Sequence, residues 1–431
     1  MGRIECTVSV PHGEASLYPP RPMRLLVVDP FPESALAEMR ALGLEVEHRT
    51  GLDEAALASA AREAGILVVR STVVSAKVIE AAARLNLIVR AGAGVNTIDV
   101  RAASARAIYV ANCPGKNASA VAELTMGLIL ALDRRIVDAT VDLRAGKWNK
   151  KEFSKAAGIR GRTIGIAGLG SIGREVLERA HAFGLIAHAW SRSLTPEKAD
   201  ELGVAYASSL EQLASRVDIL TLHLPLEGRT KKLVGREVLD AMKDGAIFIN
   251  TSRAEIVDDA ALREVVTKKK LRVGVDVLEG EPSAGQAEWS SSLVALPGVV
   301  ATPHIGASTD QAQTAIARET VRIVRSFLAE GTVPNVVNIS ATSPARSQLV
   351  VRHLDRVGVL ANVLAVIKRH RINVEEVTNT IFEGAEAACA KMRLAERPSD
   401  ECLAEINGQG DVLHVDCVAL GAGVSASGAP V

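Results

Sequence analysis

The feature that most constrains the fold is a regular alternation of short apolar runs with helical patterns, which begins at Arg24. Apolar runs of this length, separated by helices, are typical of buried strands in a parallel sheet. A long predicted helix over 118–135 divides them into two series. The first series comprises residues 24–29, 66–70, 87–92 and 108–112, and the second comprises residues 163–170, 185–192, 218–225, 246–253, 271–278 and 299–304. The pattern predicts an α/β protein with two doubly wound parallel sheets, the second having the six strands of a complete Rossmann dinucleotide-binding fold.

The order of elements changes after residue 340. A helix predicted over 309–330 and a short strand over 335–339 carry the chain back to the first sheet, and a small-residue linker over 340–344 follows. Beyond the linker we expect strand, helix, strand, strand, helix and strand. Their predicted ranges are 349–354, 358–370, 374–382, 387–394, 399–406 and 412–420. This βαββαβ order is the split pattern of ferredoxin-like domains.

These boundaries predict three domains between two loose ends, which suits a chain of 431 residues. The first 22 residues have no continuous apolar core of a secretion signal, so we expect a disordered extension, with Met23 as an alternative start. The predicted domains are a discontinuous substrate-binding domain (23–118 and 305–340), a dinucleotide-binding domain (119–304) and a C-terminal domain (341–421), followed by a loose tail (422–431).

Charge and cysteine content exclude several functions. Fifty basic and fifty acidic residues give a net charge of zero, which removes the usual electrostatic basis for binding nucleic acid or an anionic membrane. The most apolar stretch, 118–132, is too short to span a bilayer and contains Glu123. The five cysteines show no CxxC pair and no spacing typical of a metal site. We therefore expect a cytoplasmic protein with reduced thiols and no bound metal.

A GxGxxG motif occupies residues 168–173, between an apolar strand and an amphipathic helix. In this setting the glycines allow a tight turn, close approach of a pyrophosphate and packing of helix on strand, and the helix N-terminus supplies free N–H donors. The motif predicts a bound NAD or NADP. The residues expected at the coenzyme from this motif and the end of the next strand are Gly168, Gly170, Ser171, Ile172, Gly173, Ser191 and Arg192.

The end of the next strand bears on the choice of coenzyme. An NAD site usually has an acidic residue here, which binds the ribose hydroxyls. This chain has Ser191, Arg192 and Ser193 instead, a set that suits a 2′-phosphate. The sequence favours NADP or use of both coenzymes, although a solvated Arg192 beside bound NAD stays open.

Polar residues also follow later strands of the second series, notably Arg253, Glu281 and His304. Open parallel sheets place their sites at the carboxyl ends of strands. Removal of a hydride from an alcohol needs a base for the hydroxyl proton, a carboxylate that orients this base and a cation that holds the substrate. These three residues supply one group of each kind.

Several segments, from Met23 to Leu420, resemble the D-isomer-specific 2-hydroxyacid dehydrogenases. The segments that carry the resemblance are residues 90–99, 117–132, 168–175, 223–226, 249–253, 276–282 and 302–309. The resemblance implies that His304 is the acid/base, that Glu281 binds it and that Arg253 binds the substrate carboxylate. It also places Pro225 and Asp276 at the coenzyme, with Asp276 at the nicotinamide carboxamide. The backbone of Ala93 and Gly94 would lie at the substrate carboxylate.

Arg70 and the C-terminal domain point to a narrower function. Arg70 lies where family members specific for phosphoglycerate place a ligand of the substrate phosphate, although a surface arginine stays open. The resemblance therefore implies oxidation of 3-phospho-D-glycerate in L-serine biosynthesis by a homodimer or homotetramer. Two alternatives remain: a glyoxylate/hydroxypyruvate or other D-2-hydroxyacid reductase, and a non-enzymatic, coenzyme-sensing protein like the corepressors of this fold.

Residues 353–364 and 372–374 resemble an ACT domain, a module that binds a small amino acid across a domain pair. The resemblance implies that His353, Asp355 and Asn373 bind an effector, which for this function would be L-serine. A plain dimerisation module is the alternative.

Overall fold

The computed structural model describes residues 22–282, 286–340 and 342–421. The predicted N-terminal extension up to residue 21 and the predicted tail over 422–431 lie outside these ranges. The chain divides between Asn335 and Val336 into two compact units. The first unit contains both parallel sheets, and the second contains an antiparallel sheet.

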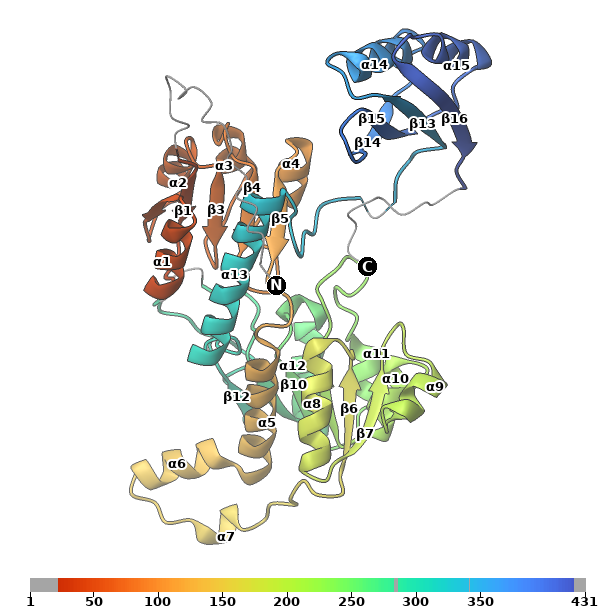
Figure 1. Ribbon diagram of the computed structural model, residues 1–431. Helices are drawn as coiled ribbons and strands as arrows, with labels where there is room; N and C mark the ends of the chain where they lie inside the picture. Colours follow the sequence, from red (N-terminus) through yellow and green to blue (C-terminus); the bar gives the residue numbers. More distant parts are fainter. Residues whose placement is uncertain (1–21, 283–285, 341, 422–431) are drawn as a thin grey trace, which may run out of the picture. The chain divides into compact units, whose positions relative to one another are not determined.

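The first sheet has five parallel strands in the order β2-β1-β3-β4-β5. Alternate residues of β1 pack into different cores, Leu25 in one and Leu26 in the other, because helices cover both faces. The polar edge strand β2 was not predicted, since its residues EVEH carry no apolar run. The strands are β1 (Arg24–Val27), β2 (Glu45–His48), β3 (Ile66–Val69), β4 (Leu87–Arg90) and β5 (Tyr109–Asn112). The helices are α1 (Glu33–Ala41), α2 (Glu54–Ala61), α3 (Ala76–Ala81), α4 (Val100–Ala105) and α13 (Asp310–Glu330), which packs on α1 (Figure 1).

The second sheet has seven parallel strands in the order β12-β11-β10-β9-β6-β7-β8. The two-residue strand β8 is an addition to the six predicted strands. Strand order reverses at β6, which lies between β9 and β7, and dinucleotides bind outside the carboxyl ends of strands at such a point. The strands are β6 (Thr163–Ala167), β7 (Ile186–Trp190), β8 (Ala205–Tyr206), β9 (Ile219–Leu222), β10 (Ile247–Asn250), β11 (Arg272–Val275) and β12 (Val299–Ala301). The packed helices are α5 (Ala118–Arg134), α8 (Ser171–Ala182), α9 (Pro196–Glu201), α10 (Leu210–Arg216), α11 (Arg236–Ala241) and α12 (Asp259–Lys269), and a 3₁₀ turn spans Ala254–Ile256.

Two short helices that were not predicted, α6 (Ile136–Arg144) and α7 (Lys150–Phe153), form an arm that runs away from the second sheet (Figure 1). Arg135, in the left-handed conformation with φ 51°, separates α5 from α6. None of the residues of α6 is buried. Its large apolar side chains, Ile136, Val137, Val141 and Leu143, are therefore mostly exposed.

The strand predicted over 335–339 does not form. The segment consists of turns and bends around a single bridge residue, Val336. Asn335 takes a left-handed conformation with φ 57°, which ends any extended run, and its side-chain amide donates to Glu319 Oε1 at 2.6 Å. The segment is thus anchored to α13 by a side chain.

The second unit has the predicted βαββαβ order. Its elements are β13 (Ser347–Leu354), α14 (Val359–Arg369), β14 (Val374–Ile381), β15 (Ala387–Leu394), α15 (Asp400–Asn407) and β16 (Val412–Ala419). The strands form a four-stranded antiparallel sheet in the order β14-β15-β13-β16. Inward residues of β13, such as Leu349 and Val351, pack against Val363 and Ile367 of α14.

None of the helices in the described ranges is both long enough and apolar enough to cross a bilayer. The same ranges hold no group of three or more His, Cys, Asp or Glu side chains that could bind a metal ion. Four cysteines within these ranges are free thiols, and Cys113 and Cys402 are buried.

Candidate active site

The glycine turn between β6 and α8 has the geometry of a dinucleotide site. Gly168 has φ 100°, and a Cβ atom there would lie 2.4 Å from the carbonyl oxygen of His223. A Cβ atom at Gly173 would lie 2.0 Å from the carbonyl oxygen of Gly168. Only glycine fits at these two positions, because backbone atoms occupy the space of a side chain.

Gly170, in contrast, faces open space, with no atom within 4 Å of an added Cβ. It precedes α8, which begins at Ser171 and has no side-chain hydrogen bond at its N-cap. The first N–H groups of this helix are therefore free to bind an anion, and the helix dipole favours negative charge there. Open backbone and free donors together fit the pyrophosphate of NAD or NADP.

The residues after β7 and β9 lie on either side of this turn. Arg192 follows β7, and its guanidinium lies 3.7 Å from Glu227 Oε2, beyond the end of β9. The same carboxylate accepts a hydrogen bond from Arg229 Nε at 2.7 Å. Pro225 shapes the loop after β9, since its carbonyl accepts a hydrogen bond from the Thr230 hydroxyl at 2.7 Å.

His304 and Glu281 form a hydrogen-bonded pair. The Nδ1–H of His304 donates to Glu281 Oε2 at 2.7 Å, and the backbone N–H of Leu278 donates to Glu281 Oε1 at 2.7 Å. Burial alone would raise the pKa of Glu281, but the bonds from His304 and Leu278 and the charge of Arg253 lower it below its usual value. The carboxylate therefore stays ionised, orients the imidazole and leaves Nε2 of His304 for a reacting group.

Asp276 fixes the loop that carries His304. Its buried carboxylate accepts hydrogen bonds from the Thr302 hydroxyl at 2.6 Å and from the backbone N–H groups of Ile305 and Gly306 at 2.8 Å each. The resemblance places Asp276 at the nicotinamide carboxamide. In the structure its carboxylate binds the neighbouring loop, which holds His304 in a left-handed conformation with φ 53°.

Arg253 lies on a rigid loop after β10. The Asn250 side chain bridges this loop, accepting from the backbone N–H of Ser252 and donating to the carbonyl of Arg253, each at 3.0 Å. Arg253 Nη1 donates to the carbonyl of Ser252 at 2.6 Å. A Cβ atom at Gly94 would lie 2.5 Å from Arg253 Nη2. The guanidinium therefore reaches the backbone at Gly94, at the end of the first sheet.

A third arginine, Arg90 at the end of β4, lies near enough to Arg253 and Arg70 to be repelled by both. Burial, followed by repulsion from Arg253 and Arg70, lowers the pKa of Arg90 to about 10. Its Nε is buried without a hydrogen-bond partner in the described residues. Nearby, the carbonyl of Ala93 accepts a hydrogen bond from the Asn112 side chain at 2.5 Å. Three guanidinium groups thus gather in this region, close to the carboxylate of Asp29.

Asp29, at the end of β1, holds the loop of Arg70. Its Oδ2 accepts hydrogen bonds from the backbone N–H groups of Arg70, Ser71 and Thr72 at 2.6, 3.1 and 3.2 Å. Sequence reasoning missed Asp29 and Arg90. Both stand at carboxyl ends of predicted strands, the same signal that identified Arg253, so this rule applied to the first sheet would have found them.

The residues predicted to bind an effector do not meet within one chain. His353 is 2% exposed, and its Nδ1 and Nε2 lie 2.8 Å from the carbonyl of Leu354 and 3.3 Å from Asn379 Oδ1. His353 pairs with Ala388 of β15, whereas Asn373 precedes the residue that pairs with Leu394 at the other end of this strand. At about 3.4 Å per residue, roughly 20 Å separates the two ends. Asp355 lies two residues after His353, and its backbone N–H donates to the carbonyl of Glu386, beside the end of β15 that pairs with His353.

Comparison with known proteins places this geometry in a family. Residues 126–306 match the NAD-binding domain of the D-isomer specific 2-hydroxyacid dehydrogenases. D-3-phosphoglycerate dehydrogenase of Methanocaldococcus jannaschii is 37% identical over 381 residues, which cover 87% of this chain and 70% of that protein. Hydroxypyruvate reductase of Thermotoga maritima is 43% identical over 303 residues, which cover 69% of this chain and 96% of that protein.

A solved structure agrees with these relatives. NADPH-dependent glyoxylate/hydroxypyruvate reductase of Sinorhizobium meliloti, in complex with NADP and malonate, superposes with a TM-score of 0.64 at 27% identity. The similarity covers 73% of this chain and 96% of that one. The chain therefore belongs to the D-isomer-specific 2-hydroxyacid dehydrogenases, oxidoreductases that act on a CH–OH group with NAD or NADP.

Proposed function

We propose that the protein oxidises 3-phospho-D-glycerate at C2 to 3-phosphohydroxypyruvate, in the biosynthesis of L-serine. The observation that carries this proposal is the group of three arginines, Arg70, Arg90 and Arg253, whose mutual repulsion contributes to the lowered pKa of Arg90. A 2-hydroxyacid alone brings one carboxylate, which one arginine can bind. A phosphate group adds about −1.5 to −2 charges and three acceptor oxygens, which suit the other two.

The chain's own groups divide the reaction between them. Arg253 binds the substrate carboxylate through its planar fork, and the backbone at Ala93 and Gly94 supports this carboxylate. His304 Nε2 accepts the proton of the C2 hydroxyl, and the ionised Glu281 stabilises the imidazolium that forms. When bound, the coenzyme accepts the hydride that leaves C2.

The phosphate binds Arg70 and Arg90 in this proposal. Arg90 is largely buried, and repulsion from Arg253 and Arg70 contributes to its lowered pKa, so an anion beside its guanidinium is favoured. Arg70 is fixed by the three backbone bonds of its loop to Asp29. A phosphate dianion relieves the repulsion between the two guanidinium groups.

A second candidate is reduction of hydroxypyruvate, because the relative with that name is 43% identical over 69% of this chain. Both candidates share Arg253, Glu281 and His304. They differ in the phosphate, so selectivity for a phosphorylated substrate distinguishes them.

Arg70→Ala and Arg90→Gln test the phosphate contacts. Each loses a charge-assisted bond worth about 1.5–3 kcal/mol, so kcat/KM for 3-phospho-D-glycerate should fall about 10- to 100-fold while kcat/KM for D-glycerate changes little. Arg84→Ala is the matched control, since Arg84 is exposed and pairs with Glu63. Equal losses on both substrates would refute the phosphate site.

For the second unit we propose an ACT-like module that binds L-serine and thereby slows the enzyme. The βαββαβ order supports this proposal. Because His353 and Asn373 lie at opposite ends of the sheet, a site that contains both needs the second units of two chains. Calorimetry should show serine binding that is lost in Asp355→Ala and that changes with substrate and coenzyme. Millimolar serine without heat or effect on rate would leave a dimerisation module.

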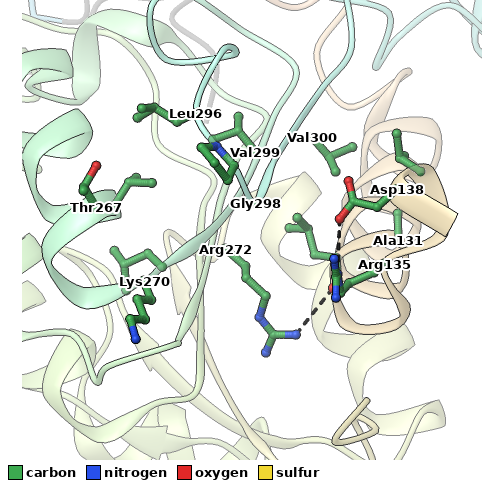
Figure 2. A pocket seen from close by; sticks show the side chains of 15 residues that line it. Ala131, Arg135, Asp138, Thr267, Lys270, Arg272, Leu296, Gly298, Val299 and Val300 are labelled. Atoms are coloured by element: carbon green, nitrogen blue, oxygen red, sulfur yellow. Dashed lines mark hydrogen bonds and ion pairs between the residues drawn. The ribbon is translucent and has the colours of Figure 1, made fainter. Parts of the chain in front are cut away.

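We further propose that the protein is a homo-oligomer and that the arm formed by α6 and α7 makes the contact between subunits. Four apolar residues of the arm's first helix are 45–58% exposed, and Trp148 beyond it is 82% exposed. An adjacent cavity of about 630 Å³ is lined by Val137 and Asp138 of α6, by Leu296 and by Val299 of β12. Asp138, Leu296 and Val299 can be followed in Figure 2. Large apolar surfaces of this kind mark protein interfaces. Trp148→Glu should lower the mass found by sedimentation equilibrium, and an unchanged mass would exclude the arm.

A further inference from the structure

A pair of buried threonine side chains joins helix α5 to the loop that carries Arg253. The hydroxyl oxygens of Thr125, in α5, and of Thr251, directly after β10, lie 3.1 Å apart. Thr125 is fully buried, and Thr251 is 7% exposed. Because a buried hydroxyl is costly to leave without a partner, Thr251 depends on this contact.

The direction of this hydrogen bond follows from a second contact of Thr125. Its Oγ1 lies 2.9 Å from the carbonyl oxygen of Val121, one turn earlier in α5. A carbonyl oxygen can only accept, and a hydroxyl group has one proton, so Thr125 donates to Val121. The Thr251 hydroxyl therefore donates to Thr125 Oγ1. These two bonds in series hold the Thr251 side chain to the backbone of α5.

The loop of Arg253 is held from two directions. The Ser252 hydroxyl donates to the carbonyl of Leu222, in β9, at 2.5 Å, and the Thr251 hydroxyl ties the preceding residue to α5. The Asn250 side chain bridges the loop itself by donating to the carbonyl of Arg253 at 3.0 Å. Loss of the anchor on α5 would leave the bridged loop free to shift as a unit, and the guanidinium would shift with it.

The same face of α5 lies against the loop that carries His304. A Cβ atom added at Gly306 would lie 3.4 Å from Val121 Cγ2 and 3.7 Å from Leu124 Cδ2. Val121, Leu124 and Thr125 stand at positions i, i+3 and i+4, so they share one face of the helix. Helix α5 therefore supports both loops, with a polar link to one and an apolar contact to the other.

We propose that Thr125 is a positioning residue: through Thr251 it holds Arg253 in the orientation that binds the substrate carboxylate. This inference rests on the role of Arg253 in the proposed function and extends it to a residue buried outside the site. Arg253 binds the carboxylate both before and during the reaction. Its misalignment should therefore raise KM more than it lowers kcat.

The test measures kcat and KM separately. Thr125→Val keeps the shape of the side chain and removes the hydroxyl, so KM should rise about 5- to 10-fold, the effect of one hydrogen bond, while kcat changes less than twofold. Thr251→Val should do the same from the other side of the bond. Thr125→Ser keeps the hydroxyl and should bring KM back to within twofold of the wild type.

The substrate is whichever of 3-phospho-D-glycerate, D-glycerate and hydroxypyruvate the wild type turns over fastest. All three carry the carboxylate that Arg253 is proposed to bind. The outcome is therefore independent of the phosphate site, and a failed phosphoglycerate proposal would leave this test valid.

Thr320→Val is the matched control. Thr320 lies in α13, is fully buried and donates to the carbonyl of Ile316 at 2.9 Å, as Thr125 does to Val121. The control should lower the Tm about as much as Thr125→Val does and leave KM unchanged. An equal rise of KM in both variants would show a general effect of lost helix packing and overturn the inference.

The double variant Thr125→Val/Thr251→Val separates one shared bond from two independent effects. If the two hydroxyls form a single link, the double variant should have the KM of either single variant. A KM that rises by the product of the two single effects would overturn the inference. So would an unchanged KM in Thr125→Val, or a raised KM that Thr125→Ser does not restore.

Discussion

Substitution of Gly94 by alanine tests how closely the first sheet approaches the catalytic arginine. The new Cβ would lie 2.5 Å from Arg253 Nη2 and 2.9 Å from Asn96 Oδ1. Ordinary contacts of this kind begin at about 3.5 Å, so the guanidinium must retreat by about 1 Å. The atom that moves is the end of a long side chain, so the fold should tolerate the change. A displacement of about 1 Å in a positioning group can cost about 10²-fold in rate.

The assay is steady-state kcat/KM together with thermal unfolding. For Gly94→Ala we expect a loss of about 10²-fold in kcat/KM and a Tm within about 3 °C of the wild type. Gly127→Ala is the matched control, because Gly127 lies within α5 with no atom within 4 Å of an added Cβ. It should keep full activity and gain about 0.5–1 kcal/mol of helix stability. Equal kcat/KM in the two variants would refute the placement of Arg253.

Other changes probe the base, the core and the turn. Glu281→Gln should lower kcat about 10- to 100-fold, because His304 loses the carboxylate that orients it and stabilises its imidazolium form; an unchanged kcat would remove Glu281 from the mechanism. A hydrogen bond from Arg322 holds the pKa of Glu319 at about 2. In the unfolded chain a glutamate has a pKa of about 4.3. The stabilisation of the folded state by ionised Glu319 is therefore fully present above this pH and is lost as the pH falls toward 2. Glu319→Gln should cost about 2 kcal/mol in urea unfolding at pH 7 and much less at pH 2.5. Gly173→Ala, whose Cβ would lie 2.0 Å from a backbone oxygen, should abolish coenzyme fluorescence enhancement; retained binding would refute the turn geometry.

The central strands of the two parallel sheets were found from the sequence because they are buried on both faces. Their continuous apolar runs are distinctive, as in Ile66–Val69. Edge strands such as β2 and β8 have a neighbouring strand on one side only and can be polar. They therefore lack the apolar run by which a strand is predicted from sequence. The strand predicted over 335–339 failed for another reason. Its residues are mostly apolar, but Asn335 takes a left-handed backbone conformation, which cannot be predicted from apolar content.

The candidate site shows a similar limit. The carboxyl ends of parallel strands indicated Arg253 and His304, because strand direction alone sets that edge of the sheet. Arg90 was missed because the same rule was applied only to the second sheet. Its burial beside two other arginines, in contrast, is seen only in the structure. The distance between His353 and Asn373 depends on the register of β15 with its neighbours, which a single sequence does not fix.

The most direct measurement of the central proposal is the ratio of kcat/KM for 3-phospho-D-glycerate to that for D-glycerate, with saturating coenzyme. Two charge-assisted phosphate contacts, each worth about 1.5–3 kcal/mol, predict a ratio of at least about 10². Arg70 and Arg90 would then bind the phosphate. A ratio below about 3, or faster turnover of hydroxypyruvate than of 3-phosphohydroxypyruvate in the reverse direction, would contradict the proposal and favour the reductase.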